Sequence, residues 1–209
     1  MISKKNLKNL SFLIYGLGLT GKSVVNFFVK NNVQNFKVWD DHNKDLYKNK
    51  RTLNLVKSLH DVDYIILSPG VSLAKSKYKN NLIKFKKKII TDLDLFFLLN
   101  KFSQSIVVTG TNGKSTTCKI LSHVLKKNKF QPVLGGNIGA PVLSLKIKKK
   151  NTLIIEASSF QLSYSKFIYP NYAILLNITN DHLDWHVNMR DYINSKFKIF
   201  ENQNKNQFA

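Results

Sequence analysis

The feature that most constrains this chain is a loop at residues 109–116, which reads Thr-Gly-Thr-Asn-Gly-Lys-Ser-Thr. The apolar run Ile106–Thr109 leads into the loop, and a helical pattern follows it to about Lys127. This order predicts a buried strand, a tight turn and a helix whose first backbone N–H groups have no partner within the helix. Such a turn attracts phosphate, so the sequence predicts a P-loop-type nucleotide site in an α/β protein.

Individual residues of this loop have separate predicted roles in binding ATP and Mg²⁺. The spacing departs from the strict G-x-x-x-x-G-K-[ST] pattern, because Val108 occupies its first position. The Lys114 ammonium can still meet the β- and γ-phosphates, and the Ser115 hydroxyl can still hold Mg²⁺. The predicted ATP-binding residues are Gly110, Thr111, Asn112, Gly113, Lys114, Ser115 and Thr116.

A second glycine loop, Gly16-Leu-Gly-Leu-Thr-Gly21, lies near the N-terminus between a predicted strand, Phe12–Tyr15, and a predicted helix, Lys22–Lys30. Its G-x-G-x-x-G spacing and the acidic Asp40 after the next strand are typical of NAD sites, although any nucleotide diphosphate would fit. A glycine turn without a ligand remains an alternative. Two nucleotide loops in one chain disfavour a simple NAD-dependent oxidoreductase, which stays open beside a non-catalytic nucleotide-binding module.

Strand-like and helix-like segments alternate along the whole chain, which predicts parallel sheets covered by helices. We expect two units: a Rossmann-like domain over residues 1–100 and a P-loop-type ATPase domain over 101–209. The other predicted strands are Phe36–Trp39, Tyr64–Leu67, Ile89–Ile90, Gln131–Leu134, Thr152–Ile155 and Ala173–Asn177, and the other predicted helices are Leu93–Leu99 and Lys196–Phe200. Because Gln207-Phe-Ala209 resembles the start of another strand, we expect the second unit to be truncated.

The formal net charge of +21 invites a nucleic-acid interpretation. Arg51 and Arg190 are the only arginines among 33 basic residues, however, and nucleic-acid readers rely on arginine for bidentate contacts. A lysine bias of the composition explains the charge, and we expect no nucleic-acid partner. No apolar stretch reaches the ~20 residues of a membrane span, so we expect no membrane insertion. The single cysteine, Cys118, is expected to be buried, which fits a cytoplasmic protein.

Two residues at strand ends suggest a metal site near the Lys114 loop. Glu156 follows the apolar strand residues Leu153–Ile155, and His182 comes shortly after the strand that ends at Asn177. Both should lie at the carboxyl edge of the sheet, where they could share Mg²⁺ with the loop hydroxyl. Either residue alone could be structural. The four histidines without a partner pattern are expected at the surface or in packing: His42, His60, His123 and His186.

The residues described so far resemble the Mur ligases. The loop Gly110–Thr116 resembles the ATP loop of these enzymes and of folylpolyglutamate synthetase. Asn137-Ile-Gly139, the Glu156 strand end and Asn177–Asp184 follow in the order that the family shows. Three segments resemble the branch that adds D-glutamate to UDP-N-acetylmuramoyl-L-alanine, namely Gly16–Ser23, Ser68–Ser72 and Glu156–Leu162.

This resemblance implies a monomeric three-domain ligase of peptidoglycan synthesis that uses ATP and forms an acyl phosphate. Residues 1–100 would bind the UDP substrate, residues 101–209 would form the N-terminal part of the ATPase domain, and the C-terminal domain for D-glutamate would be absent. The 209-residue chain by itself is therefore expected to be inactive. Asp40 would serve the uridine end of the substrate, and His42 stands where some relatives carry arginine.

The resemblance also implies roles for single residues. Lys196, in Tyr192-Ile-Asn-Ser-Lys-Phe197, matches a lysine that the family carbamylates with CO₂. Without the resemblance, Lys196 would be interpreted as a surface lysine in a lysine-rich helix. The implied catalytic residues are Lys114, His182 and Lys196. The implied metal ligands are Ser115, Glu156, His182 and the Lys196 carbamate. The implied substrate contacts are Leu19, Thr20, Asp40, Asp41, Ser72, Asn137, Ser158, Gln161 and His182.

Overall fold

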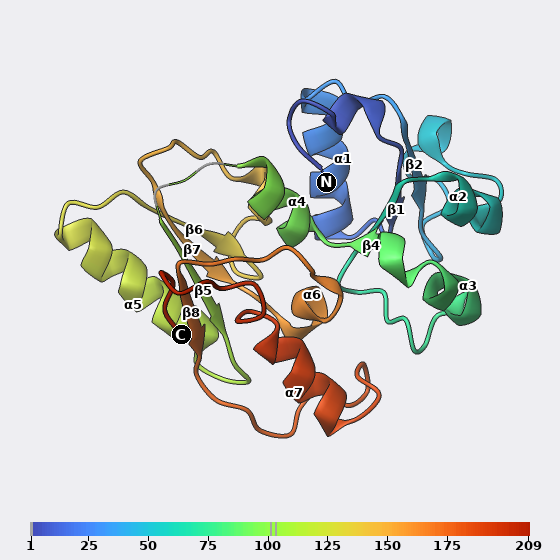
Figure 1. The fold of residues 1–209 in the computed structure, drawn as a ribbon. Coiled ribbons are helices and arrows are strands. Elements are labelled where there is room, and N and C mark those ends of the chain that lie inside the picture. The colour runs from blue at the N-terminus through green and yellow to red at the C-terminus, as the bar shows by residue number, and fades with distance from the viewer. Residues whose placement is uncertain (1, 101, 103) are drawn as a thin grey trace.

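The computed structural model describes residues 2–100, 102 and 104–209. Its strands form two four-stranded parallel sheets with the orders β2-β1-β3-β4 and β6-β7-β5-β8 (Figure 1). The first unit contains β1 (Phe12–Tyr15), α1 (Leu19–Lys30), β2 (Phe36–Trp39), α2 (Leu55–Asp61), β3 (Tyr64–Leu67), α3 (Lys79–Lys84), β4 (Ile89–Ile90) and α4 (Asp92–Leu99). The second contains β5 (Gln104–Thr109), α5 (Lys114–Lys127), β6 (Pro132–Gly136), β7 (Thr152–Glu156), α6 (Ser159–Tyr164), β8 (Tyr172–Leu175) and α7 (Met189–Phe197). This architecture confirms the predicted α/β class.

Helices cover both faces of the first sheet, and both faces are accordingly apolar. All four residues of β1 are buried, and successive side chains point to opposite faces of a strand. Phe12 and Ile14 therefore join the core beside α1, where the rings of Phe12 and Phe28 lie 4.7 Å apart. Leu13 and Tyr15 join a second cluster with Leu55 and Leu59 of α2.

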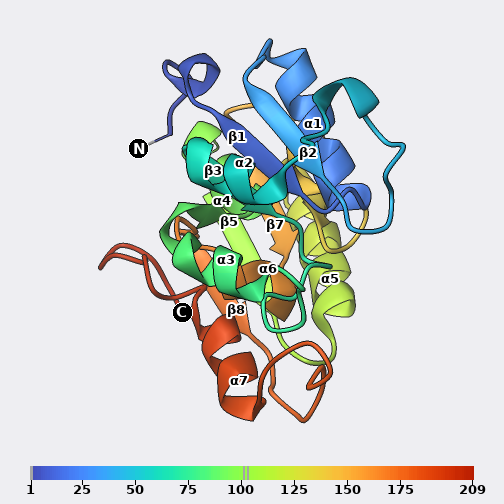
Figure 2. The ribbon, with the colours of Figure 1, turned by 90° about the vertical axis from the view of Figure 1, so that its right-hand side faces the viewer.

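The two units share one apolar core. Val107, Leu153 and Ile155 of the second sheet belong to the same buried cluster as the α1 face of the first sheet. The turn Val142–Ser144 packs against both α1 and α4, so α4 lies between the two sheets, as both ribbon views show (Figures 1 and 2). The opposite face of the second sheet packs against α5 and buries Cys118, as predicted.

Three sequence predictions need correction. The last helix runs over Met189–Phe197 and not over 196–200, because the Asn188 side chain accepts a hydrogen bond from Asp191 N–H and begins the helix there. The predicted strand to Asn177 ends at Leu175, since Asn177 turns to bond the phosphate loop. Helix α1 begins at Leu19, three residues before the predicted start, and helices α2, α3 and α6 were not among the predicted elements.

The ends of the two units were only partly predictable. The proposed boundary between residues 100 and 101 falls on Lys101, which lies outside the described residues. Phe208 pairs in parallel with Tyr172 at the outer side of β8, as the strand-like end of the sequence predicted. Within the part of the chain that the structure describes, no helix combines the length and apolarity that crossing a bilayer requires.

Two buried carboxylates begin α4. Asp94 accepts from Thr91 N–H and, across the unit boundary, from Lys166 N–H at 2.8 Å and Phe167 N–H at 2.7 Å. Asp92 is 1% exposed, and neither of its oxygens has a hydrogen-bond partner among the described residues. Burial raises the pKa of Asp92 to about 7, and the nearby Gln161 amide opposes only part of this rise.

We expect Asp92→Asn to stabilise the fold more at pH 8 than at pH 4. The folded state holds the Asp92 proton up to about pH 7, whereas an aspartate side chain in the unfolded chain has its ordinary pKa of 3.8. Wild-type stability should therefore fall as pH rises through this window, by roughly 2–4 kcal/mol. Urea unfolding of both proteins at the two pH values measures the difference. The exposed Asp45→Asn is the matched control, and an equal effect of Asp92→Asn at both pH values would contradict the prediction.

Candidate active site

The phosphate loop connects the carboxyl end of β5 to the start of α5. Gly113 caps the helix with φ 81°, a left-handed conformation that favours glycine. The segment after β8 braces the loop: Asn177 Oδ1 accepts from Asn112 N–H at 2.9 Å, and Asn177 O accepts from Thr111 N–H at 3.0 Å. The first turn of α5 is thus held with its N–H groups at the sheet edge, which suits an anion.

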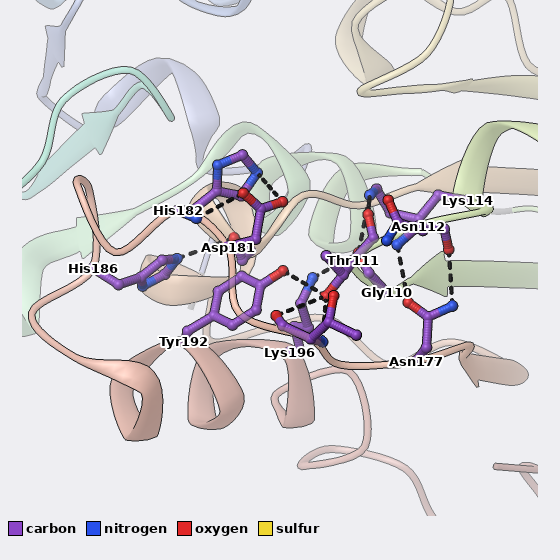
Figure 3. Close-up of polar contacts among 12 residues, drawn as sticks. Gly110, Thr111, Asn112, Lys114, Asn177, Asp181, His182, His186, Tyr192 and Lys196 are labelled. Carbon is purple, nitrogen blue, oxygen red and sulfur yellow. Dashed lines mark hydrogen bonds and ion pairs between the residues drawn. The ribbon is translucent and has the colours of Figure 1, made fainter.

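Two lysines from different helices converge on one carbonyl oxygen of this loop. Lys114 Nζ donates to Gly110 O at 2.9 Å and to Thr111 O at 2.7 Å. Lys196 Nζ, from α7, donates to the same Gly110 O at 2.7 Å (Figure 3). No ion pair among residues 2–100, 102 and 104–209 includes either ammonium. The loop therefore carries an excess of positive charge that an anion would relieve.

Lys196 is the one fully buried lysine among the residues that the structure describes. It is 1% exposed, and its ammonium lies 4.5 Å from the centre of the Tyr192 ring. Burial, together with the charge of Lys114, lowers the pKa of Lys196 to about 8, against the opposing charge of Asp181. A larger fraction of the amine is therefore neutral, and nucleophilic, near neutral pH than for an ordinary lysine.

Glu156, the last residue of β7, lies beside the loop as predicted. Its Oε2 accepts from the Ser115 hydroxyl at 2.6 Å, and its Oε1 accepts from the Asn137 amide at 2.7 Å. The buried Glu156 carboxylate and the hydroxyl of the exposed Ser115 are hard oxygen ligands of the kind that Mg²⁺ takes. No group of three or more His, Cys, Asp and Glu side chains gathers in the described chain, so Mg²⁺ here would need phosphate and water ligands as well.

Within the described residues, His182 contacts neither Lys196 nor Glu156 directly. Its backbone has φ 54°, a strained conformation for a residue other than glycine. The His182 ring lies 4.7 Å from that of Phe160 and 6.2 Å from that of Tyr192, the ring that Lys196 approaches. Among the predicted metal ligands, Ser115 therefore bonds Glu156 directly, whereas His182 and Lys196 are linked only through the Tyr192 ring.

A cavity of about 680 Å³ opens beside the first glycine loop. It is lined by five of the predicted substrate contacts, Leu19, Thr20, Asp40, Asp41 and Ser72. Asp184 and Trp185 of the second unit complete its wall, and the Ser72 hydroxyl donates to Trp185 O at 3.0 Å. The cavity therefore runs from the first glycine loop toward the segment that carries His182.

The two aspartates of this cavity already have protein partners. Burial disfavours the charged Asp40, but hydrogen bonds from the N–H groups of Leu17, Asn43 and His42 outweigh it and lower the pKa of Asp40. Asp41 accepts from the Tyr15 hydroxyl at 2.6 Å. Asp40 is thereby held ionised and ties the glycine loop to the turn after β2.

Asn137, Ser158 and Gln161 do not line the cavity. Asn137 bonds Glu156, while Ser158 and Gln161 form a capping box: Ser158 Oγ accepts from Gln161 N–H, and Gln161 Oε1 accepts from Ser158 N–H. These contacts give both side chains a structural partner at the start of α6. Their substrate role stays a prediction.

The sequence did not indicate two residues of this region. Tyr192 donates to or accepts from the Thr111 hydroxyl at 3.0 Å, and its helical spacing from Lys196 is the signal that could have placed it. His186, expected at the surface or in packing, is buried between Ser159 and Asp191. Burial lowers the pKa of His186, and Asp191 opposes this shift.

Comparison with known families divides the chain at nearly the same place as its two sheets. Residues 10–90 match the Mur ligase MurD-like N-terminal domain, and residues 108–209 match the Mur ligase middle domain. Both glycine loops, Glu156, His182 and Lys196 lie inside these matches.

Individual relatives agree with the family matches. The UDP-N-acetylmuramoylalanine--D-glutamate ligase of Rickettsia prowazekii is 41% identical over 94% of this chain and 45% of its own length. The enzyme of the same name from Wolbachia pipientis is 36% identical over 92% of this chain and 39% of its own. A solved ligase from Neisseria meningitides (UDP-N-acetylmuramate:L-alanyl-gamma-D-glutamyl-meso-diaminopimelate ligase) aligns over 91% of this chain and 67% of its own with 14% identity and a TM-score of 0.48. The chain spans less than half of the two curated relatives, and it belongs to the Mur ligase family.

Proposed function

We propose that this chain is the UDP-substrate- and ATP-binding part of a ligase that joins D-glutamate to UDP-N-acetylmuramoyl-L-alanine in peptidoglycan synthesis. The observation that carries the proposal is the pair of lysines on Gly110 O, at the same sheet edge as the buried Glu156 carboxylate and its Ser115 hydroxyl partner. The names of the relatives supply the substrate pair. Residues 1–100 would bind the UDP substrate and residues 101–209 the ATP, in a cytoplasmic, monomeric enzyme.

The proposed reaction begins with phosphoryl transfer. A carboxylate oxygen of the L-alanyl group forms a bond to the γ-phosphorus of ATP, the bond to the β-phosphate oxygen breaks, and ADP leaves. Lys114 would exchange its carbonyl partners for the phosphoryl oxygens and neutralise their charge in the transition state. Ser115 and Glu156 would hold Mg²⁺, which supplies further charge neutralisation on the phosphates.

The second step forms the amide. The amine nitrogen of D-glutamate attacks the acyl carbon, the tetrahedral intermediate expels phosphate, and the nitrogen loses a proton. Because the acyl phosphate and D-glutamate both carry negative charge, positioning and charge compensation dominate catalysis. Asn137, Ser158, Gln161 and His182 would line the path of the muramoyl-alanine group between the cavity and the loop.

Lys196 would act as a carbamate. Its neutral amine would attack CO₂, an N–C bond would form and a proton would leave, so that an anion replaces a buried ammonium. Support comes from the burial of Lys196, its shared acceptor with Lys114 and its lowered pKa. The carbamate would remove the repulsion between the two lysines, and with His182 it would hold a second Mg²⁺.

Calorimetric titration of this chain with UDP-N-acetylmuramoyl-L-alanine tests the proposal, with NAD as the competing ligand. We expect the UDP-sugar to bind and NAD not to bind. Gly70 lines the cavity, and a Cβ added there meets nothing within 4 Å, so Gly70→Trp should place a bulky ring at the cavity and abolish binding. Val124→Trp, on the exposed face of α5, is the matched control. Binding of NAD alone would instead favour the oxidoreductase alternative.

A further inference from the structure

The buried Ser159 and His186 and the half-exposed Asp191 form a series of contacts between α6, α7 and the segment before α7. His186 Nε2 lies 3.0 Å from Ser159 Oγ, and His186 Nδ1 lies 3.1 Å from Asp191 Oδ2. The order of contacts matches that of a Ser-His-Asp triad. Ser159 and His186 are 2% and 3% exposed, so no substrate reaches the hydroxyl. The contacts therefore point to a role in positioning and not in nucleophilic catalysis.

His186 belongs to the same turn as His182. The backbone N–H groups of Trp185 and His186 both donate to His182 O at 3.0 Å, which closes the turn after the strained His182. The Phe160 ring lies against this turn, 4.7 Å from the ring of His182 and 5.8 Å from that of His186. Movement of the His186 ring would therefore disturb the His182 ring through both the turn and Phe160.

His186 also contacts the helix that carries Lys196. Its ring lies 5.2 Å from that of Tyr192, and the Lys196 ammonium lies 4.5 Å from the centre of the same tyrosine ring (Figure 3). Asp191, the hydrogen-bond partner of His186, is in the first turn of this helix. The imidazole thus joins the His182 turn to α7.

We propose that His186 is a positioning residue. Ser159 and Asp191 fix its imidazole as the Nδ1–H tautomer, and the fixed ring keeps His182 and Lys196 in place beside the phosphate loop. The Asp191 carboxylate only accepts hydrogen bonds, so Nδ1 carries the proton. Nε2 is then free to accept from the Ser159 hydroxyl. The inference rests on the proposed function, in which His182 and Lys196 act together.

Substitutions at Asp191 and Ser159 separate this role from mere packing. Asp191→Asn keeps an oxygen that accepts from Nδ1–H, whereas Asp191→Ala removes the acceptor. Ser159→Ala removes the donor to Nε2 but fills nearly the same space. Arg190→Ala changes an exposed residue of the same helix turn and serves as the matched control.

Long-range ¹H–¹⁵N NMR of the imidazoles in this chain reads the tautomer and the position of His182 directly. We expect Nδ1–H for His186 in the wild type, Asp191→Asn and Arg190→Ala. In Asp191→Ala the tautomer should change, and the His182 ring signals should shift because the ring moves relative to Phe160. Uptake of ¹³CO₂ at Lys196 should fall roughly tenfold in Asp191→Ala and Ser159→Ala, the scale typical of losing a partner behind a ligand, and should survive in Asp191→Asn.

An Nε2–H or cationic His186 in the wild type would overturn the inference, as would His182 signals unchanged by Asp191→Ala. The NMR measurements do not depend on ligase chemistry. A wild-type chain with the expected tautomer and a shifted His182 in Asp191→Ala, but no CO₂ uptake at all, would support the positioning role and contradict the proposed carbamate.

Discussion

In a full-length ligase that carries this segment, Lys114→Ala should lower the rate of acyl-phosphate formation by roughly 10²–10³-fold or more. Lys114 extends from the first residue of α5 to the Gly110 and Thr111 carbonyls, where its ammonium is available to incoming phosphates. The transferred group gains charge on its oxygens in the transition state, and alanine leaves that charge without a donor. Single-turnover formation of ADP with the UDP substrate present measures the loss.

The matched control for this prediction is Lys119→Ala, on the same helix but exposed. It removes the same charge from the chain without removing a group from the loop, so turnover should stay close to that of the wild type. A Lys114→Ala enzyme with near-normal turnover would remove Lys114 from the catalytic set. Equal losses in both variants would show that net charge, and not the loop contact, determines the rate.

Gly21→Ala should destabilise the chain by about 3 kcal/mol or more and abolish binding in the cavity beside the first glycine loop. A Cβ at this position would lie 1.8 Å from the backbone oxygen of Gly16, which cannot rotate away as a flexible side chain would. Relief requires α1 to move from β1, and the core contact between Phe12 and Phe28 would open with it. Urea unfolding measures the stability, and calorimetry measures the binding.

Gly18→Ala is the control in the same loop, because an added Cβ there meets nothing within 4 Å. Its stability should stay close to that of the wild type. If Gly21→Ala were as stable as Gly18→Ala, the close packing of α1 on the loop would be wrong. The pair also separates two roles of the motif, because only Gly21 is required by helix packing.

The sequence predicted the elements with clear boundaries. Phe12–Tyr15, Phe36–Trp39, Tyr64–Leu67 and Ile89–Ile90 are strands at the predicted positions, because short apolar runs that end at glycine, proline or acidic residues have few other ways to fold. The loop Gly110–Thr116 was predictable for a similar reason, since its glycines, lysine and hydroxyls together suit one geometry.

Helices without a strong apolar period were harder to predict from the sequence. Residues 55–61 and 79–84 form α2 and α3, yet each is short, and the lysines and asparagines of α3 resemble the loops of this lysine-rich chain. The helix around Lys196 was placed seven residues too late at its start, because the Asn188 cap looks like any other asparagine here. The lysine- and asparagine-rich composition therefore made the residues that begin and end these helices hard to distinguish from loop residues.

The side-chain partners in the candidate site could not be predicted from the sequence. Nothing in the sequence indicates that Lys196 and Lys114 share one carbonyl, because the two lie 82 positions apart and meet only when α7 packs beside the loop. The buried place of His186 likewise depends on Ser159 and Asp191, which approach it from two helices. Residue types were predictable from spacing, whereas contacts between distant elements depend on packing.

The apolar cluster that runs through both units determines how the chain unfolds. Val107 and Ile155 are buried by the same cluster as Phe12 and Phe28, so neither sheet can lose its core without exposing part of the other. The two units should therefore unfold in one cooperative transition. A ligand that binds in the cavity beside the first glycine loop would then also protect the rest of the second unit, as far as α5, from transient opening.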